Sequence, residues 1–392
     1  MIQAAKKLFQ ENIREYGMYI AFITIIVFFT ITTHGLFLSP RNIGNLLNAT
    51  SYIAVLAVGM TLVIVIRHID LSVGFLAGFL GAVAAIALKY WELPVYLTIP
   101  FVLGLGIIAG LITAFMVAQL KIPAFVATLA GALVYRGLLQ TVTAGTGTII
   151  IADKFFNAIG NGFISEIPGL AVFPELQKTT LLLGIIAIIL FVTGEIRNRR
   201  KTQVYHFEVL PRNMFILKLV VVSALIGGIA WLLAGYQGLT WASVVLLIVV
   251  VIYSFMTTRT VLGRHIYAVG GNPEAAELSG ISVKRITYLV FGSMGLLTAV
   301  SAILFASWLR SATTIAGTLF ELDAIAAAFV GGVAVAGGVG KVTGSIIGAL
   351  VMASLTNGMN LMGIDISSQY IVRGLVLAAA VIFDVTTRKG AK

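Results

Sequence analysis

Long apolar segments separated by short polar ones follow one another along the whole chain. Several of them hold about 18 to 25 residues with almost no charge, which is enough for a helix to cross roughly 30 Å of hydrocarbon. This pattern predicts twelve transmembrane helices, near residues 17–36, 50–66, 72–88, 95–118, 123–140, 179–196, 215–235, 241–257, 286–308, 321–338, 342–362 and 367–385.

The composition indicates the same class of fold. The 392 residues are 59% hydrophobic and only 10% charged, and their mean hydropathy is +1.04. A soluble domain of this length would need far more charge to cover its surface. The first apolar stretch is too long for a signal peptide, and no small-residue cleavage site follows it, so we expect it to stay as a span. We predict an all-α polytopic integral membrane protein with a single transmembrane domain over residues 1–392.

The distribution of Lys and Arg predicts the orientation in the membrane. With a cytoplasmic N-terminus, nineteen of the 26 lie inside, five lie outside, and Arg136 and Arg373 fall within spans. The positive-inside rule then places both termini in the cytoplasm. The loop 141–178 is extracytoplasmic, where it either covers the bundle or docks a partner. The predicted cytoplasmic segments are 1–16, the basic connector 197–218, the loop 258–285 and the C-terminus 386–392.

The residues present exclude several kinds of chemistry. The chain has no cysteine, and its four histidines form no HExxH motif, so we expect no metal site and no cofactor. These histidines fall at span edges or in loops, which argues against an intramembrane hydrolase. The stretch AGGVGKVTG is similar to a P-loop but fails at both ends, at Val335 and Val342, so the chain itself does not bind ATP. We attribute the net charge of +11 to the topology and expect no nucleic-acid partner.

A short polar insert, YAVGGNPEAAELSGISVKR at residues 267–285, interrupts this apolar chain. Asn272 suits a helix N-cap, Pro273 suits the first helical position, and Gly280 suits the residue after the helix. These signals predict a cytoplasmic helix over residues 273–279, too short to be stable alone in water. It therefore needs a surface to lie on. The residues alone leave two interpretations open, an ordinary capped loop and a mechanical link to a soluble subunit.

The sequence also indicates close helix packing and an internal repeat. Glycines recur at four-residue spacing, which lets helices approach closely in lipid; they are Gly74 with Gly78, Gly106 with Gly110, and Gly340 with Gly344 and Gly348. The stretch Asp70–Gly78 matches Asp323–Gly331 in spacing, on opposite sides of the membrane, as an inverted repeat requires. Arg136-Gly137-Leu138 recurs as Arg373-Gly374-Leu375, but both arginines fall in the outer half, so the repeat is only suggested.

The insert and four other segments resemble one family. GNPEAAELSGI resembles the cytoplasmic coupling motif of the permease subunits of sugar-importing ABC transporters of the ribose, xylose and galactose group. The agreement covers the chain from Asn12 onward and extends to GMTLVIVIRHIDLSVG, IPAFVATLAG, ELDAIAAAFVGG and GGVGKVTGSIIGAL. Many members have NNG where this chain has Thr356-Asn357-Gly358, a mild departure. The N-terminus and the extra spans around the basic connector are most similar to the xylose and multiple-monosaccharide permeases.

The resemblance implies a multi-pass subunit of the cell inner membrane that imports a monosaccharide and has no enzymatic activity. Two copies of the chain would form the pore, a separate cytoplasmic ABC ATPase would hydrolyse ATP, and an extracytoplasmic sugar-binding protein would deliver the sugar. The insert would be the coupling helix between the spans and the ATPase. Its ATPase-coupling residues would be Gly270, Gly271, Asn272, Glu274, Ala275, Ala276, Glu277, Ser279 and Gly280.

Polar residues in or beside the spans are the candidates for the translocation path. They are Asp70, Ser72, Asp323, Asn357, Asn360, Gln369 and Tyr370. For Asp70, a local ion pair with Arg67 is the simpler interpretation. For Asp323, Arg136 and Arg373, pairing between helices is favoured over sugar contact, because a neutral sugar needs amide, hydroxyl and aromatic groups. The alternative function is an ion-coupled secondary transporter of a small polar solute, which the edge positions of Asp70 and Asp323 disfavour.

Overall fold

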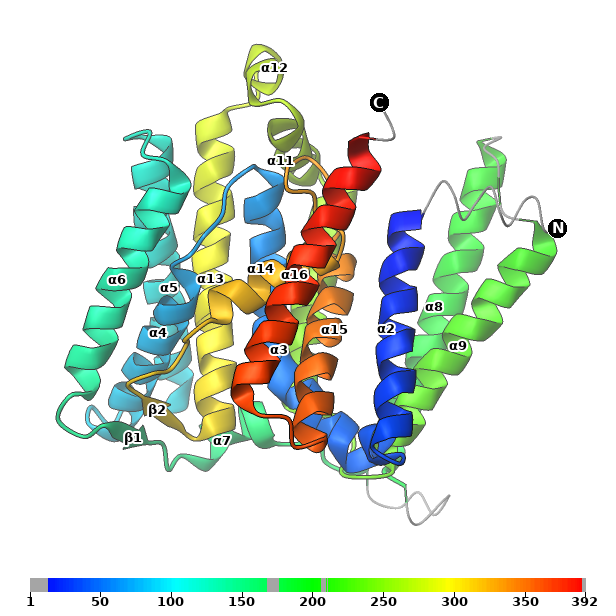
Figure 1. The fold of residues 1–392 in the computed structure, drawn as a ribbon, viewed down its shortest axis with the longest axis horizontal. Coiled ribbons are helices and arrows are strands. Elements are labelled where there is room, and N and C mark those ends of the chain that lie inside the picture. The colour runs from blue at the N-terminus through cyan, green and yellow to red at the C-terminus, as the bar shows by residue number, and fades with distance from the viewer. Residues whose placement is uncertain (1–12, 168–175, 206–208, 210, 390–392) are drawn as a thin grey trace.

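The protein is a bundle of long helices, seen here in a computed structural model that describes residues 13–167, 176–205, 209 and 211–389 (Figure 1). Within these residues, nine helices are long and apolar enough to cross a membrane, which confirms a polytopic all-α membrane protein. The helices of the first part are α2 (Ile13–Thr32), α3 (Pro40–Val65), α4 (Val73–Lys89), α5 (Val95–Ala118), α6 (Ala124–Thr143), α7 (Lys154–Asn161), α8 (Lys178–Val204) and α9 (Arg212–Ala234). Those that follow are α10 (Trp241–Arg259), α11 (Val261–Gly271), α12 (Pro273–Leu278), α13 (Val283–Leu309), α14 (Phe320–Val330), α15 (Val342–Leu361) and α16 (Ile366–Lys389), and the 3-10 helix η1 covers Leu36–Leu38.

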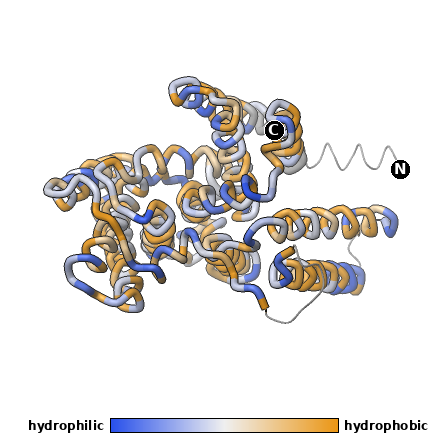
Figure 2. Tube along the Cα trace, turned by 90° about the horizontal axis from the view of Figure 1, so that it is seen from below, coloured by the Kyte–Doolittle hydropathy of each residue, from blue (hydrophilic) through white to orange (hydrophobic). Residues whose placement is uncertain are grey.

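Two helices, α3 and α13, form the centre of the bundle. They pack against each other, α13 also packs on α4 and α5, and α3 also packs on α14 and α15. By contrast, α9 has a mean hydropathy of 2.3, although only 6% of its most apolar window is buried inside the protein. Hydrophobic residues dominate the outer helices and hydrophilic residues gather mainly at the turns (Figure 2). Such exposed apolar faces require lipid as their solvent.

The two ends of the bundle differ. At one end lies α12, together with the start of α2 and the end of α16; we call it the α12 end (Figure 1). At the opposite end, β1 (Thr148–Ile150) pairs antiparallel with β2 (Ser311–Thr313) in a two-stranded sheet, with Ile149 opposite Ala312. We call this the β1–β2 end.

The window predicted at 321–338 is not a continuous helix. Only α14 is helical there, and its 11 residues reach about 16 Å at 1.5 Å per residue, too short to span a membrane. The chain then forms turns before α15, with positive φ angles at Gly332, Gly337 and Gly338. In Figure 1, α14 lies at mid-height of the bundle, so this crossing combines a half-helix with non-helical chain. The edge position predicted for Asp323, in the first turn of α14, is therefore wrong.

The order of elements supports the inverted repeat. A long helix, a non-helical segment, a shortened helix and two long helices occur as α3 to α6 and again as α13 to α16. The packing is reciprocal, because α13 contacts α5 while α3 contacts α15. The matched stretches of the sequence, Asp70–Gly78 and Asp323–Gly331, fall on the two shortened helices, α4 and α14. Discontinuous helices of this kind line substrate paths in transporters.

Glycines make the closest contacts between the repeats. A side chain at Gly110 of α5 would overlap the carbonyl oxygen of Phe291 in α13, and one at Gly74 of α4 would overlap that of Gly317. Within the second repeat, Gly344 lies against Gly331 in the same way, where α15 crosses the end of α14. These positions agree with the predicted glycine faces, except that Gly340 precedes α15 instead of belonging to it.

Three segments differ from the predicted boundaries. α3 begins at Pro40, ten residues before the predicted span, with proline at its first turn. The basic connector 197–218 is largely helical, because α8 continues to Val204 and α9 begins at Arg212. The loop 258–285 holds a further helix, α11, whose start is capped by Thr260, the acceptor of a hydrogen bond from the amide of Gly263. Hydropathy alone indicated none of these.

Candidate functional site

A polar cavity of about 260 Å³ lies between α3, α14, α15 and α16. This volume is just below the roughly 300–1,000 Å³ of small-molecule sites, which suits a ligand of few atoms. The cavity combines amide, hydroxyl and aromatic groups with one acid and one base. Its lining residues are Leu46, Ala49, Thr50, Tyr52, Ile53, Asp323, Ala349, Met352, Ala353, Thr356, Asn357, Asn360 and Arg373.

An ion pair forms part of the cavity wall. The guanidinium of Arg373, on α16, pairs with the carboxylate of Asp323, in the first turn of α14. Their side chains are 19% and 21% exposed. The ring of Tyr370 lies 6.0 Å from the guanidinium carbon of Arg373. The predicted pairing between helices thus holds for Asp323 and Arg373, and both also line the cavity.

Amide side chains form the floor of the cavity near the β1–β2 end. Asn357 and Asn42 exchange two hydrogen bonds, at 2.9 and 3.0 Å, which join α15 to the start of α3. Gln369 donates from Nε2 to Oδ1 of Asn360 at 2.7 Å and to the carbonyl of Ile364 at 2.9 Å. Because a neutral polyhydroxylated ligand is held by such donors and acceptors, this floor suits a sugar better than an ion.

Aromatic rings hold Tyr52 beside the cavity. Its ring lies 5.0 Å from the rings of Phe305 and Phe320, measured between centroids. The hydroxyl of Ser301 donates to the carbonyl of Tyr52 at 2.9 Å, which ties α3 to α13 at this level. Tyr52 was not among the residues predicted from the sequence, although the polar run Asn48 to Tyr52 was a usable signal once α3 was known to begin at Pro40.

The predicted path residues do not form one group. Asp323, Asn357 and Asn360 line the cavity, Gln369 supports Asn360, and Tyr370 packs beside Arg373 and is 52% exposed. Asp70 and Ser72 lie elsewhere, at the start of α4. There the carboxylate of Asp70 accepts hydrogen bonds from the amide and the hydroxyl of Ser72, at 2.9 and 2.6 Å. Neither of these two lines the cavity.

The remaining charged residues of the first repeat have other partners than predicted. Arg67 does not pair with Asp70; its guanidinium donates to the carbonyl oxygens of Gly270 and Gly271, just before α12. A spacing of three residues favours an ion pair only on a helix, and α3 ends at Val65. Arg136 of α6 lies over the ring of Phe75, with its guanidinium carbon 5.4 Å from the ring centroid.

The polar insert folds as its capping signals predict. Asn272 caps α12 by accepting a hydrogen bond from the amide of Ala275 at 3.1 Å, and Gly280 follows the helix with φ of 82°. The helix ends at Leu278, one residue earlier than predicted. Of its six residues only Ala276 is buried, so α12 stands out from the bundle at its end (Figure 1).

The exposed surface of α12 carries both acidic and apolar side chains. Glu274 and Glu277 are exposed, and Leu278 is 91% exposed, more than any other large hydrophobic residue described. Sequence analysis missed Leu278, because an isolated leucine in a polar loop gives no signal. An apolar side chain surrounded by charges is typical of a protein interface anchor.

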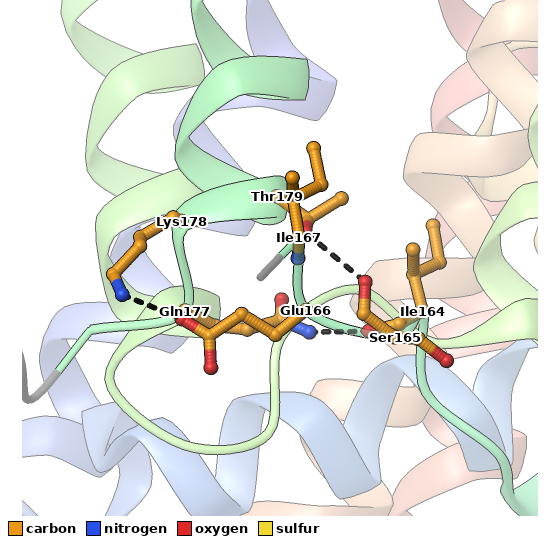
Figure 3. A network of polar contacts seen from close by, with 7 residues as sticks. All are labelled: Ile164, Ser165, Glu166, Ile167, Gln177, Lys178 and Thr179. Carbon is orange, nitrogen blue, oxygen red and sulfur yellow. Dashed lines mark hydrogen bonds and ion pairs between the residues drawn. The ribbon is translucent and has the colours of Figure 1, made fainter. Parts of the chain in front are cut away.

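The loop 141–178 is a folded surface at the β1–β2 end. Asn161, at the end of α7, donates to the carbonyls of Ser307 and Trp308 at 2.7 and 3.0 Å. Beyond α7 the chain is fixed to the start of α8, where Lys178 pairs with Glu166 at 3.3 Å (Figure 3). Residues 168–175 of this loop lie outside the described part. The described rest of the loop is attached to α13 through Asn161 and to α8 through Glu166.

The polar hydrogen bonds in Figure 3 complete that attachment. The hydroxyl of Thr179 accepts from the amide of Ile167 at 3.1 Å and donates to the carbonyl of Ser165 at 3.0 Å. The amide group of Gln177 donates to the carbonyl of Ile164. A surface segment that is fixed by several hydrogen bonds in this way can present a constant shape to a partner.

Both the family match and the individual relatives of this chain are transport permeases. Residues 42–381 match the family described as the permease component of the branched-chain amino acid transport system. The chain is 40% identical over 383 residues to the xylose transport system permease protein XylH of Haemophilus influenzae, covering 98% of this chain and 99% of that one. It is 39% identical over 378 residues to XylH of Escherichia coli, covering 96% and 93%.

A second group of relatives is more distant. The chain is 34% identical over 374 residues to the ribose import permease protein RbsC of Haemophilus influenzae, covering 94% of this chain and 93% of that one. No solved structure matches the chain.

Proposed function

The chain belongs to the family described as the permease component of the branched-chain amino acid transport system, and from that premise we propose that it is the membrane-spanning subunit of an ATP-driven importer of a monosaccharide. Xylose is the first candidate, because the relatives that share 39–40% identity over nearly the full chain are named as xylose permeases. The α12 end faces the cytoplasm, in agreement with the distribution of Lys and Arg. The membrane is the cell inner membrane.

The cavity between α3, α14, α15 and α16 carries this proposal. It begins beside Asp323 at the start of a half-helix and extends to Asn360 in the last turn of α15. The sugar passes between the amide groups of Asn357 and Asn360 and the ion pair of Asp323 with Arg373. Asp70 and Ser72 form the corresponding start of α4 in the other repeat and support the path without lining the cavity. The selectivity of the permease then depends on hydrogen bonds between these side chains and the hydroxyl groups of the sugar.

The chain acts as a subunit and not as an enzyme. ATP is hydrolysed by a separate cytoplasmic ABC ATPase that binds α12, with Leu278 as the apolar anchor and Glu274 and Glu277 as the charged rim. An extracytoplasmic sugar-binding protein docks on the platform formed by β1, β2 and α7. Two copies of the chain form the pore, each presenting its exposed apolar helix faces to lipid or to the other copy.

An ion-coupled secondary transporter is the alternative. The sequence argument against it fails in part, because Asp323 begins a half-helix at mid-height of the bundle and not at an edge (Figure 1). Asp323 is nevertheless paired with Arg373, so its charge is already balanced. Binding of an ABC ATPase at α12 therefore distinguishes the ATP-driven importer from the secondary transporter.

The test is to purify the chain from its native membrane in mild detergent and to measure ATP-driven xylose uptake after reconstitution. We expect an ABC ATPase to co-purify, and we expect its yield to fall at least about tenfold when Glu274 and Glu277 are both replaced by lysine, because the rim charges are reversed. Glu92→Lys, at an exposed residue between α4 and α5 at the opposite end, serves as the control. A chain that purifies alone, and transports alone under an ion gradient, would show that the alternative is correct.

A further inference from the structure

Arg67 joins the end of α3 to the chain just before α12. Its Nε donates to the carbonyl oxygen of Gly270 at 2.7 Å, and its terminal nitrogen donates to the carbonyl oxygen of Gly271. These are the last two residues of α11. A guanidinium is suited to this place, because it offers several donors in one plane and its charge is attracted to the carbonyl end of a helix. Arg67 itself has φ of 66°, a conformation that non-glycine residues rarely adopt.

A third segment meets the other two at the same point. The amide of Gly338 donates to the carbonyl oxygen of Val65 at 2.8 Å, and the hydroxyl of Tyr267 donates to the carbonyl oxygen of Gly340 at 2.6 Å. A side chain at Gly270 would overlap both the carbonyl oxygen of Val65 and the nitrogen of Gly338. Gly270 therefore meets Val65 and Gly338 through backbone atoms.

Each of the three segments leads to a different element of the bundle. Gly271 is followed by Asn272, the cap of α12. Arg67 lies six residues before the start of α4, the shortened helix of the first repeat. The segment 331–341 connects α14 to α15, both of which line the cavity. One small region thus borders the proposed ATPase contact and both shortened helices.

We propose that Arg67 is the positioning residue that transmits displacement of α12 to both repeats. This inference rests on the proposed function. When the ATPase moves α12, the two carbonyl oxygens at the end of α11 pull Arg67 and with it the segment that leads into α4. The guanidinium also holds the end of α11 in its backbone contact with Val65 and Gly338, so the segment between α14 and α15 moves at the same time. Without the guanidinium, α12 moves and the ATPase turns over, but the cavity does not respond.

The test uses the complex of the chain with its ATPase in proteoliposomes, with the variants Arg67→Gln and Arg67→Lys. Arg264→Gln is the matched control, because Arg264 is an exposed arginine on α11, the helix whose end Arg67 contacts. We expect each Arg67 variant to keep the ATPase bound and hydrolysing. For Arg67→Gln, sugar taken up per ATP hydrolysed falls about tenfold, in the range of coupling free energies between sites. Arg67→Lys restores part of the ratio, since an ammonium can reach one carbonyl but not hold both.

A thiol probe measures the coupling without transport. The chain has no cysteine, so Ala353→Cys places a single thiol in the cavity, and its rate of labelling by a soluble maleimide is read on this chain alone. In the otherwise wild-type complex the rate changes when ATP and vanadate are added, whereas in Arg67→Gln it does not.

Three experimental outcomes distinguish a failure of the role of Arg67 from a failure of the proposed importer function. Unchanged uptake per ATP and an unchanged labelling response in both Arg67 variants would overturn the role of Arg67, while ATP-driven uptake by the wild-type complex still supports the importer. Loss of coupling in Arg264→Gln to the same degree would also overturn it. A wild-type complex that takes up sugar without ATP would overturn the proposed function itself. If Arg67→Gln does not reach the membrane, the same criteria apply to Arg67→Lys.

Discussion

Uptake by the Asp323→Asn variant falls at least about 100-fold, because the change leaves the guanidinium of Arg373 unpaired in a site of low dielectric constant. Breaking one side of a buried ion pair costs about 3–5 kcal/mol, which is a large part of the stability of a typical domain. The side chains of this pair are only about one-fifth exposed. Arg373→Gln has an effect of the same size, since it leaves the carboxylate of Asp323 alone.

The double variant Asp323→Asn with Arg373→Gln provides the control. Removing both charges abolishes the free-energy cost of an unpaired buried charge. The amount of folded protein in the membrane therefore returns toward that of the wild type. Uptake and folded protein are measured separately, by labelled xylose and by size-exclusion chromatography. If the double variant folds but stays inactive, the pair contacts the sugar; if it also transports, the pair is structural. Normal uptake by either single variant would contradict the role of the pair.

The second large effect is on folding, at the contact between α5 and α13. In Gly110→Leu, the new side chain would overlap the carbonyl oxygen of Phe291 and push the two helices apart. In lipid, helices associate through close van der Waals contact and not through the hydrophobic effect, so a lost contact is not replaced. We expect at least about tenfold less monodisperse protein after detergent extraction, since overpacking of a close contact costs several kcal/mol.

Gly104→Leu is the matched control for this prediction. Gly104 lies on the same helix, one to two turns before Gly110, and a Cβ atom added there has open space around it. Its extraction profile should equal that of the wild type. Equal losses in both variants would mean that leucine harms α5 in general, and a normal profile for Gly110→Leu would show that the α5–α13 contact can yield.

The sequence predicted the parts of the fold that depend on local composition. Each predicted span overlaps one helix, and the caps of α12 were placed correctly at Asn272 and Gly280, because hydropathy and capping act within a few residues. The break after Val330 was missed, since an apolar run has the same hydropathy whether it is helical or not. The glycines at 331, 332, 337 and 338 were the signal that could have shown it.

The cavity was less predictable, because its residues come together only in three dimensions. Asp323, Asn357 and Asn360 were chosen for their chemistry, yet the partner of Asp323 is Arg373, fifty residues later. Arg67 was assigned to its neighbour Asp70, whereas its actual partners lie about 200 residues away. Sequence proximity is a poor guide wherever the chain leaves a helix, as it does after Val65.

The pairing of β1 with β2 can form only late in synthesis. β1 emerges from the ribosome about 160 residues before β2, so at 5–20 residues per second it waits roughly 10–30 seconds for its partner. During that interval the glycine face of α5 has no α13 to pack on, and that of α4 has neither Ala316 nor Gly317. The first repeat must therefore survive as an incomplete intermediate until the second repeat has been inserted beside it.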